Sequence, residues 1–192
     1  HLEQGNDVIY VGCSSALSSS VKTAVVVRDE LITHYPGRKI VVIDSLVSGM
    51  SLGLIAIECA KMRDLGKTTD ECEEWVESHK FLYNQCSTVD SLNYLKEAGR
   101  VTASSAFFGN LFAVKPIIIS NSKGQNQAIS KVKGRKSSFS EISNHVSDYI
   151  VDCDDQTIWI GHADCEQEAD ELAVELRNKM PEATIDKYGV VS

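Results

Sequence analysis

Basic charge is scarce in this chain of 192 residues. Nineteen lysine and arginine residues stand against 27 aspartate and glutamate residues, which gives a net charge of −8 at pH 7. Non-specific binding to nucleic acid needs a basic excess that displaces counterions from the phosphates, and docking on anionic membranes needs basic clusters. We therefore expect neither nucleic acid nor a charged membrane surface as a partner.

Paired cysteine motifs are also absent. None of the six cysteines is spaced as C-x-x-C, so the sequence supports neither a zinc ribbon nor a redox motif. A chain of this size with 43% hydrophobic residues can build a core without disulfides, so we expect reduced thiols and a cytoplasmic location. We expect no metal and no cofactor.

Long hydrophobic runs are missing as well. No signal peptide is visible, because the first residues of the chain are polar. The most apolar region, residues 46–62, contains serines, glycines and Glu58, so it is too short and too polar to span a bilayer. A buried helix explains this region better, and we expect no stable membrane insertion.

What the sequence does contain is a serine-rich stretch directly after its first apolar run. Residues 8–11 (VIYV) are typical of a buried strand, and five serines lie within residues 14–20, where a helical pattern begins. Such a helix start offers unpaired N–H groups, partial positive charge and hydroxyl donors, which together predict an anion site. A carboxylate fits better than a phosphate, because the loop lacks the glycines and the lysine of a phosphate cradle. A second interpretation stays open, in which the serines only cap the helix.

The first half of the chain has the pattern of a βαβ unit followed by helices. A helical face over residues 21–32 separates the first apolar run from a second run at residues 39–43 (KIVVI). Strand, helix and strand over this distance predict a parallel βαβ unit. We then expect a mostly apolar helix over residues 46–65 with a glycine C-cap. A further helix should begin with a capping box at residues 68–71. Its expected buried face consists of Trp75, Val76, His79, Leu82 and Tyr83.

From residue 86 onward the pattern changes to α+β. The turn residues 121–124 (NSKG) separate two strand-like runs and predict a hairpin. Ser138 and Glu141 predict the start of another helix, and a strand, an amphipathic helix and a last strand follow. The predicted fold class is therefore α/β, with a βαβα domain over residues 1–84 and an α+β domain with a hairpin over residues 85–192.

Three further features are candidates for chemistry. His162 and Asp164 at a strand end could supply a general base, although a histidine bonded to the backbone is the favoured interpretation. Residues 131–136 (KVKGRK) form the one basic patch of the chain. They are either a solvated strand end or a surface that attracts an acidic partner or a phosphate. Arg100 follows a glycine, and the simplest interpretation is an arginine that satisfies helix-end carbonyls.

Taken in order along the chain, several motifs resemble those of the DegV family of bacterial fatty-acid-binding proteins. Residues 14–20 (SSALSSS) resemble the family's S-S-x-L-S-G-T loop, and residues 42–45 (VIDS) resemble its V-I/V-D-S strand end. Residues 90–101 (DSLNYLKEAGRV) resemble D-x-L-x-x-L-x-x-G-G-R-I/V, and residues 108–116 (FGNLFAVKP) resemble L-G-N-L-L-x-I-K-P. Shorter matches lie at residues 131–134 (KVKG) and 161–163 (GHA), so the resemblance covers essentially the whole chain.

The resemblance implies a two-domain α/β protein that holds a long-chain fatty acid in an apolar tunnel between its domains. It implies a lipid-binding role without catalysis, because some members are the lipid-holding subunit of an ATP-dependent fatty acid kinase. The loop that would hold the carboxylate is matched by Ser15, Ser18, Ser14 and Ser19. The positions linked to the head group or to the kinase partner are matched by Arg100 and Lys133. For the tunnel lining we choose Leu54, Ile57, Phe107, Phe108 and Leu111.

The sequence departs from the family pattern in three ways. Ser19 stands where the loop has a glycine, and Lys133 stands where the family has an arginine, which loses bidentate phosphate geometry. The family's opening D-S strand, its T-S-x-P loop and its closing H-x-G-P-G segment have no counterpart here, so we expect a chain truncated at both ends. The residues alone keep a second class open, a serine hydrolase or phosphate-binding α/β enzyme, although no G-x-S-x-G elbow is present.

Overall fold

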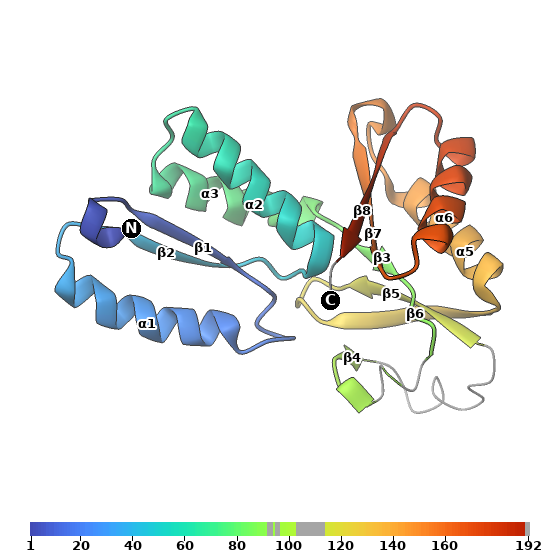
Figure 1. The fold of residues 1–192 in the computed structure, drawn as a ribbon, viewed down its shortest axis with the longest axis horizontal. Helices are drawn as coiled ribbons and strands as arrows, with labels where there is room; N and C mark the ends of the chain where they lie inside the picture. The colour runs from blue at the N-terminus through green and yellow to red at the C-terminus, as the bar shows by residue number, and fades with distance from the viewer. Residues whose placement is uncertain (92–93, 95–96, 103–113, 191–192) are drawn as a thin grey trace. The chain divides into compact units, whose positions relative to one another are not determined.

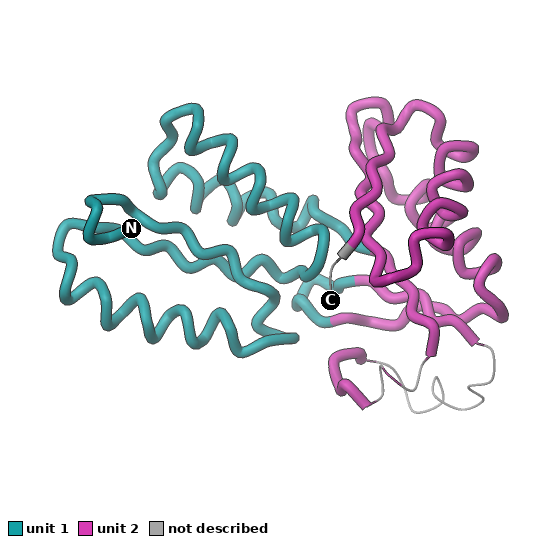
Figure 2. The backbone as a smooth tube through the Cα atoms, viewed as in Figure 1, with its two compact units in different colours: residues 1–85, 120–125 teal, residues 86–119, 126–192 magenta. Residues whose placement is uncertain are grey.

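The computed structural model describes residues 1–91, 94, 97–102 and 114–190. Figure 2 shows that the chain divides into two compact units. The first unit comprises residues 1–85 and 120–125, and the second comprises residues 86–119 and 126–192. The domain boundary at residues 84 and 85 stays a prediction. The turn at residues 120–125 belongs to the first unit, although it lies beyond the predicted boundary in the sequence.

The first unit is built on a parallel strand pair. Strand β1 (Val8–Gly12), helix α1 (Ser20–His34) and strand β2 (Ile40–Asp44) form a βαβ unit in which Val8 pairs with Ile40 and Gly12 with Asp44. This confirms the predicted parallel arrangement. Figure 1 shows α1 on one side of the strand pair and helices α2 (Gly49–Asp64) and α3 (Thr69–His79) on the other. Short 3₁₀ turns lie at Leu2–Gln4 (η1) and Lys80–Leu82 (η2).

Helix α3 begins as its sequence predicts. The Thr68 hydroxyl accepts a hydrogen bond from the Glu71 N–H (3.2 Å), and the Glu71 carboxylate accepts one from the Thr68 N–H (2.8 Å). This reciprocal capping box satisfies two N–H groups that the helix itself leaves unpaired. The carboxylate also accepts from the Lys67 ammonium (2.8 Å), and these bonds lower the pKa of Glu71 to about 2.

Helix α2 begins later than predicted. The sequence favours a start at Leu46, but this residue has a left-handed backbone (φ 57°) and the helix starts at Gly49. The Asp44 carboxylate accepts a hydrogen bond from the Leu46 N–H (3.2 Å), which holds residues 45–48 in a loop. The predicted end is correct, since Gly66 has φ 77° and donates its N–H to the Arg63 carbonyl (2.9 Å).

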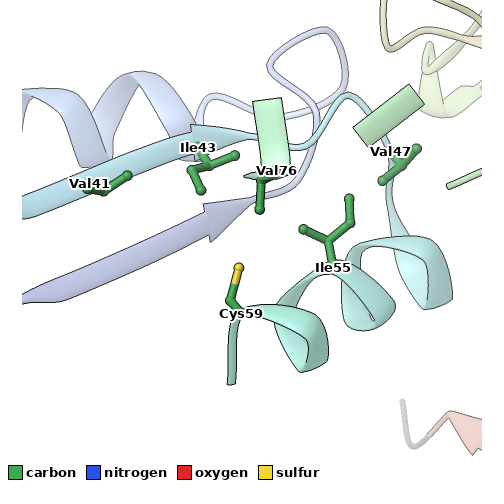
Figure 3. Close-up of a cluster of buried hydrophobic side chains, with 6 residues drawn as sticks. All are labelled: Val41, Ile43, Val47, Ile55, Cys59 and Val76. Carbon is green, nitrogen blue, oxygen red and sulfur yellow. The ribbon is translucent and has the colours of Figure 1, made fainter. Parts of the chain in front are cut away.

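The core of the first unit lies between β2 and the helices α2 and α3. Figure 3 shows its buried side chains, which are Val41, Ile43, Val47, Ile55, Cys59 and Val76. Trp75 and Tyr83 pack against this cluster, in agreement with the predicted face of α3. The prediction for Leu82 is wrong, because this residue lies in η2 beyond the end of the helix and its side chain is 71% exposed.

The second unit contains a four-stranded sheet in the order β3-β5-β6-β4. Its strands are β3 (Cys86–Ser87), β4 (Val101–Thr102), β5 (Val114–Ser120) and β6 (Asn126–Lys133). Strands β5 and β6 are hydrogen-bonded neighbours joined by a short turn, which confirms the predicted hairpin. Strand β3 pairs with β5 in antiparallel orientation, and β4 pairs with β6 in parallel orientation.

Helix α5 (Arg135–Tyr149) packs against this sheet and begins one turn before its predicted cap. The Ser138 hydroxyl donates to the Arg135 carbonyl (2.6 Å) inside the helix, so it does not cap the first turn. The backbone enters the helix at Gly134 with φ 85°, a conformation that glycine adopts without strain. The prediction that the helix starts at Ser138, based on a capping box of Ser138 and Glu141, is therefore wrong.

The last part of the chain is a second parallel βαβ unit. It comprises β7 (Thr157–Ala163), α6 (Glu166–Lys179) and β8 (Thr184–Val190), preceded by a 3₁₀ turn η4 (Cys153–Asp155). The buried apolar residues between these strands and α6 are Ile160, Ala169, Ala173, Leu176 and Met180. Over the part of the chain that the structure describes, no helix has both the length and the apolarity to cross a bilayer.

Candidate functional site

Three segments of the first unit meet at the carboxyl edge of its strand pair. They are the loop at residues 13–20, here called the Ser loop, the segment at residues 45–48, and the turn at residues 120–125. Because β1 and β2 are parallel and pair Gly12 with Asp44, the first two segments leave the sheet at the same edge. Ligands of open α/β sheets bind at this edge.

Asp44 ties the two strand-end loops together. One oxygen of its carboxylate accepts hydrogen bonds from the Ser15 N–H (3.1 Å) and the Leu46 N–H (3.2 Å). The Ser45 hydroxyl adds a bond to the Gly12 carbonyl (2.7 Å) across the strand pair. The sequence reasoning did not assign this role to Asp44, although the V-I-D-S strand end contained the signal.

Ser14 is fully buried and differs from the other serines of the loop. Its hydroxyl donates to the Gly124 carbonyl oxygen (2.7 Å) and accepts from the Ala16 N–H (3.2 Å). A serine hydroxyl carries one proton, so in this arrangement it has no donor left for an anion. The structure therefore separates Ser14 from the other three predicted ligands.

Ser15 and Ser18 keep hydroxyl protons that could reach a ligand. Over the described residues, the Ser15 hydroxyl makes no hydrogen bond, and Ser18 Oγ only accepts one, from the Ser20 N–H (3.2 Å). Ser19 is exposed and stands at the N-cap of α1, where its side chain makes no capping bond. The interpretation of the loop as a plain helix cap is therefore not supported at Ser19.

Ser20 is a candidate that the sequence reasoning did not single out. Its hydroxyl oxygen is buried and has no hydrogen-bond partner among the described residues. Leaving such a group unpaired costs about 1–3 kcal/mol, which an acceptor on a bound ligand would offset. A signal was present, since Ser20 occupies the last position of the S-S-x-L-S-G-T match, where the pattern also has a hydroxyl.

The remaining predicted site residues are distributed over both units. On α2, Leu54 is partly buried and Ile57 is 39% exposed, while Phe107, Phe108 and Leu111 lie outside the described residues. In the second unit, Lys133 is exposed at the end of β6. Arg100 is exposed and donates to the Ala98 carbonyl (2.6 Å), in agreement with an arginine that satisfies helix-end carbonyls. The predicted tunnel stays a prediction.

In the part of the chain that the structure describes, no base contacts the serines that a hydrolase would use. Neither the Ser15 nor the Ser18 hydroxyl donates to a histidine or carboxylate within the described residues. His162 lies in β7 of the second unit, and its buried Nδ1 has no partner there. Cys13 lies next to the Ser loop serines, and burial and the charge of Asp44 both raise the pKa of its thiol. The thiol is therefore kept protonated and is a poor nucleophile.

Comparison with known proteins decides the family. A family model described as "Uncharacterised protein, DegV family" matches residues 1–191. The chain belongs to the DegV family. It is 35% identical to a DegV domain-containing protein of Clostridium perfringens, and 29% identical to one of Streptococcus pyogenes serotype M1. These matches cover 100% and 92% of the chain but only 66% and 60% of the two relatives, so the chain spans less than two thirds of their length.

Solved structures of DegV proteins share the fold. A Ruminococcus gnavus DegV protein described with vaccenic acid has a TM-score of 0.85 at 22% identity, covering 98% of this chain and 69% of that one. The Streptococcus pneumoniae fatty acid kinase B3 protein, loaded with linoleic acid, has a TM-score of 0.84 at 19% identity. That match covers 98% of this chain and 67% of the other. The likeness confirms the predicted two-domain α/β class.

Proposed function

We propose that this protein binds a long-chain fatty acid and holds its carboxylate at the Ser loop, without catalysing a reaction. One observation carries the proposal. The hydroxyls of Ser15, Ser18 and Ser20 keep protons that no described acceptor takes, and the three serines follow one another closely in the sequence where the chain enters α1. The fatty acids named for the solved DegV proteins support the choice of ligand.

The energetics favour several neutral donors at such a site. Moving a carboxylate from water into an apolar site costs several kcal/mol unless hydrogen bonds replace its hydration. A hydrogen bond to a charged acceptor contributes about 1.5–3 kcal/mol, so two or three hydroxyls are sufficient. The partial positive charge at the helix start adds to this, because α1 begins at Ser20 and its cap residue uses no side chain.

The acyl chain and the partner extend the same proposal. The chain would run along the apolar residues that the sequence suggests, of which Leu54 and Ile57 lie on α2. Phe107, Phe108 and Leu111 complete that set from outside the described residues. An ATP-dependent fatty acid kinase is the proposed partner, with Arg100 and Lys133 facing it or the head group. The kinase name of the S. pneumoniae protein supports this choice of partner.

The experiment measures affinity and stability together. Ser15→Ala and Ser18→Ala should each weaken binding of oleate or palmitate roughly ten- to a hundredfold, in line with one lost charged hydrogen bond. The melting temperature of the apo protein should barely change in Ser15→Ala, whose hydroxyl has no partner among the described residues. It should fall slightly in Ser18→Ala, which removes the acceptor of the Ser20 N–H at the start of α1. Ser140→Ala, an exposed serine on α5, is the matched control.

Native mass spectrometry supplies the independent measurement. Co-purified acids of about C14–C18 mass would support the carrier, since chains of this length bury enough CH₂ groups to bind tightly. Labelling of Ser15 or Ser18 by a fluorophosphonate would instead indicate a hydrolase. Equal affinity in wild type and both serine variants would contradict the proposed carboxylate site.

A further inference from the structure

The hairpin turn touches the Ser loop across a long stretch of sequence. The hydrogen bond from Ser14 Oγ to the Gly124 carbonyl joins residues 110 positions apart, and both residues are buried. A Cβ atom added to Gly124 would overlap Ser14 Oγ and would lie 3.1 Å from Leu46 Cα. The backbone of the turn therefore packs directly on the Ser loop and on the loop after β2, with no room for a side chain.

The turn holds this carbonyl in a fixed place. The Asn121 side-chain oxygen accepts from the Lys123 N–H (2.9 Å) and the Gln125 N–H (3.1 Å). Backbone bonds from Asn121 N–H to Gln125 O and from Gly124 N–H to Asn121 O, both 2.9 Å, close the same turn. Gly124 has φ 72°, which favours glycine at this position. The acceptor for Ser14 is thus preorganised by local contacts.

On the other side of the contact, Ser14 organises the Ser loop. Its hydroxyl accepts from the Ala16 N–H, and its carbonyl accepts from the N–H groups of Leu17 (2.9 Å) and Ser18 (3.0 Å). A displacement of Ser14 would therefore carry the backbone of Ser15 and Ser18 with it. The Ser15 and Ser18 hydroxyls, which we propose as ligands of the carboxylate, would then move as well.

We propose that the turn at residues 121–125 positions the Ser loop for its ligand, with Gly124 and Ser14 as the positioning residues. The inference rests on the proposed function, and it moves Ser14 from the ligands to the residues that hold them. Ser14 acts through the backbone of Ser15 and Ser18, because its own proton is already donated to Gly124.

The test compares alanine substitutions at two glycines that both have a left-handed backbone conformation. Gly124→Ala places a methyl group against Ser14, whereas at Gly37, with φ 89°, no described atom lies within 4 Å of an added Cβ. Both variants carry the strain of an alanine in a left-handed conformation. Only Gly124→Ala should lower the affinity for oleate, by at least about tenfold, because it displaces a serine hydroxyl that donates to the charged carboxylate. It should also speed amide exchange at Ser15 and Ala16.

A second pair of variants serves if Gly124→Ala fails to fold. Asn121→Ala removes the side-chain acceptor that builds the turn and should weaken oleate binding, while Asn121→Asp keeps an acceptor oxygen and should restore most of the affinity. Equal affinity and equal exchange in Gly124→Ala and Gly37→Ala, alongside tight wild-type binding, would overturn the inference alone. A wild-type protein that binds no oleate would instead refute the proposed function and the positioning role together.

Discussion

Gly12 is the residue at which β1 turns into the Ser loop, and Gly12→Ala is a sharp test of the packing there. An added Cβ would lie 2.5 Å from Val21 Cγ2 and 2.9 Å from Tyr10 Cε1, both closer than real Cβ contacts. Val21 is buried in the first turn of α1 and has a β-branched side chain with one strongly preferred helical rotamer. An alanine at this position therefore forces the Val21 and Tyr10 side chains, or the backbone that carries them, to shift.

The expected loss of stability follows from two opposing terms. Overpacking of this kind typically costs about 1–3 kcal/mol. Replacing glycine by alanine restricts the unfolded chain and returns about 0.4–1 kcal/mol. We expect a net loss of about 1–2 kcal/mol, which corresponds to a fall in melting temperature of roughly 2–8 °C for a chain of this size.

The two tryptophans allow the first unit to be followed by itself. Trp75 lies in the first unit and Trp159 in the second, so a Trp159→Phe parent leaves a single reporter in the unit under test. Urea unfolding monitored by fluorescence then gives the loss for Gly12→Ala, for Val21→Ala and for the double variant. Because Val21→Ala removes Cγ2, the double variant should lose less than the sum of the singles. Additive losses, or a Gly12→Ala variant as stable as its parent, would refute the reasoning.

Four further outcomes are expected. Thr68→Ala should destabilise the first unit by roughly 1 kcal/mol in urea unfolding, because it breaks the capping box of α3. The folded-state pKa of Glu71, about 2, lies below its ordinary value of 4.5. The stability that the ionised Glu71 carboxylate gives the fold should therefore be complete above about pH 4.5 and lost as the pH falls toward 2. An NMR titration of this carboxyl in Lys67→Gln should give a higher pKa, because the variant lacks the ammonium group that lowers it. Ile55→Ala should cost about 2–5 kcal/mol in the same unfolding assay, since the side chain is completely buried. Burial raises the pKa of Cys86 to about 12, so a thiol reagent at pH 8 should label Cys86 only in urea, as peptide mass spectrometry would show.

Local patterns predicted the elements whose causes are local. The capping box at Thr68 and Glu71 forms because both partners lie within one helical turn. The parallel pairing of β1 and β2 follows from two short apolar runs separated by one helical face. The hairpin turn is likewise local, since Asn121 and Gly124 supply its acceptor and its left-handed backbone. The capping box and the turn are each decided by residues a few positions apart, and the strand pair by two runs with a single helix between them.

The two wrong helix starts have causes that such patterns do not contain. The start of α2 depends on Asp44, whose carboxylate captures the Leu46 N–H and stops helix formation there. The start of α5 depends on the backbone at Gly134, and it leaves Ser138 inside the helix as a hydroxyl bonded to a preceding carbonyl. A motif at the right spacing names residues that can cap a helix, but the surrounding backbone decides whether they do.

The sequence predicts the Ser loop as a candidate site, whereas the different contacts of its serines are seen only in the structure. Five serines at a strand-to-helix turn look equivalent in the sequence. The partner that distinguishes Ser14 is Gly124, 110 residues away, and the burial that distinguishes Ser20 is a property of the folded unit. Contacts of this kind, which only the folded chain contains, distinguish serines that the local pattern does not.

The charges around the loop extend the sequence argument for a carboxylate over a phosphate. Asp44 places a negative charge against the Ser15 backbone, and the nearby Lys80 ammonium, 3.3 Å from the Asp44 carbonyl, is already paired with Glu77 at 2.6 Å. These three groups together carry a net negative charge, and among them Asp44 contacts the Ser loop directly. A phosphate dianion would meet about twice the repulsion of a carboxylate at the same distance, with the same neutral donors to offset it. At the proposed site, a singly charged head group such as a fatty acid carboxylate would therefore meet less repulsion than a phosphate dianion.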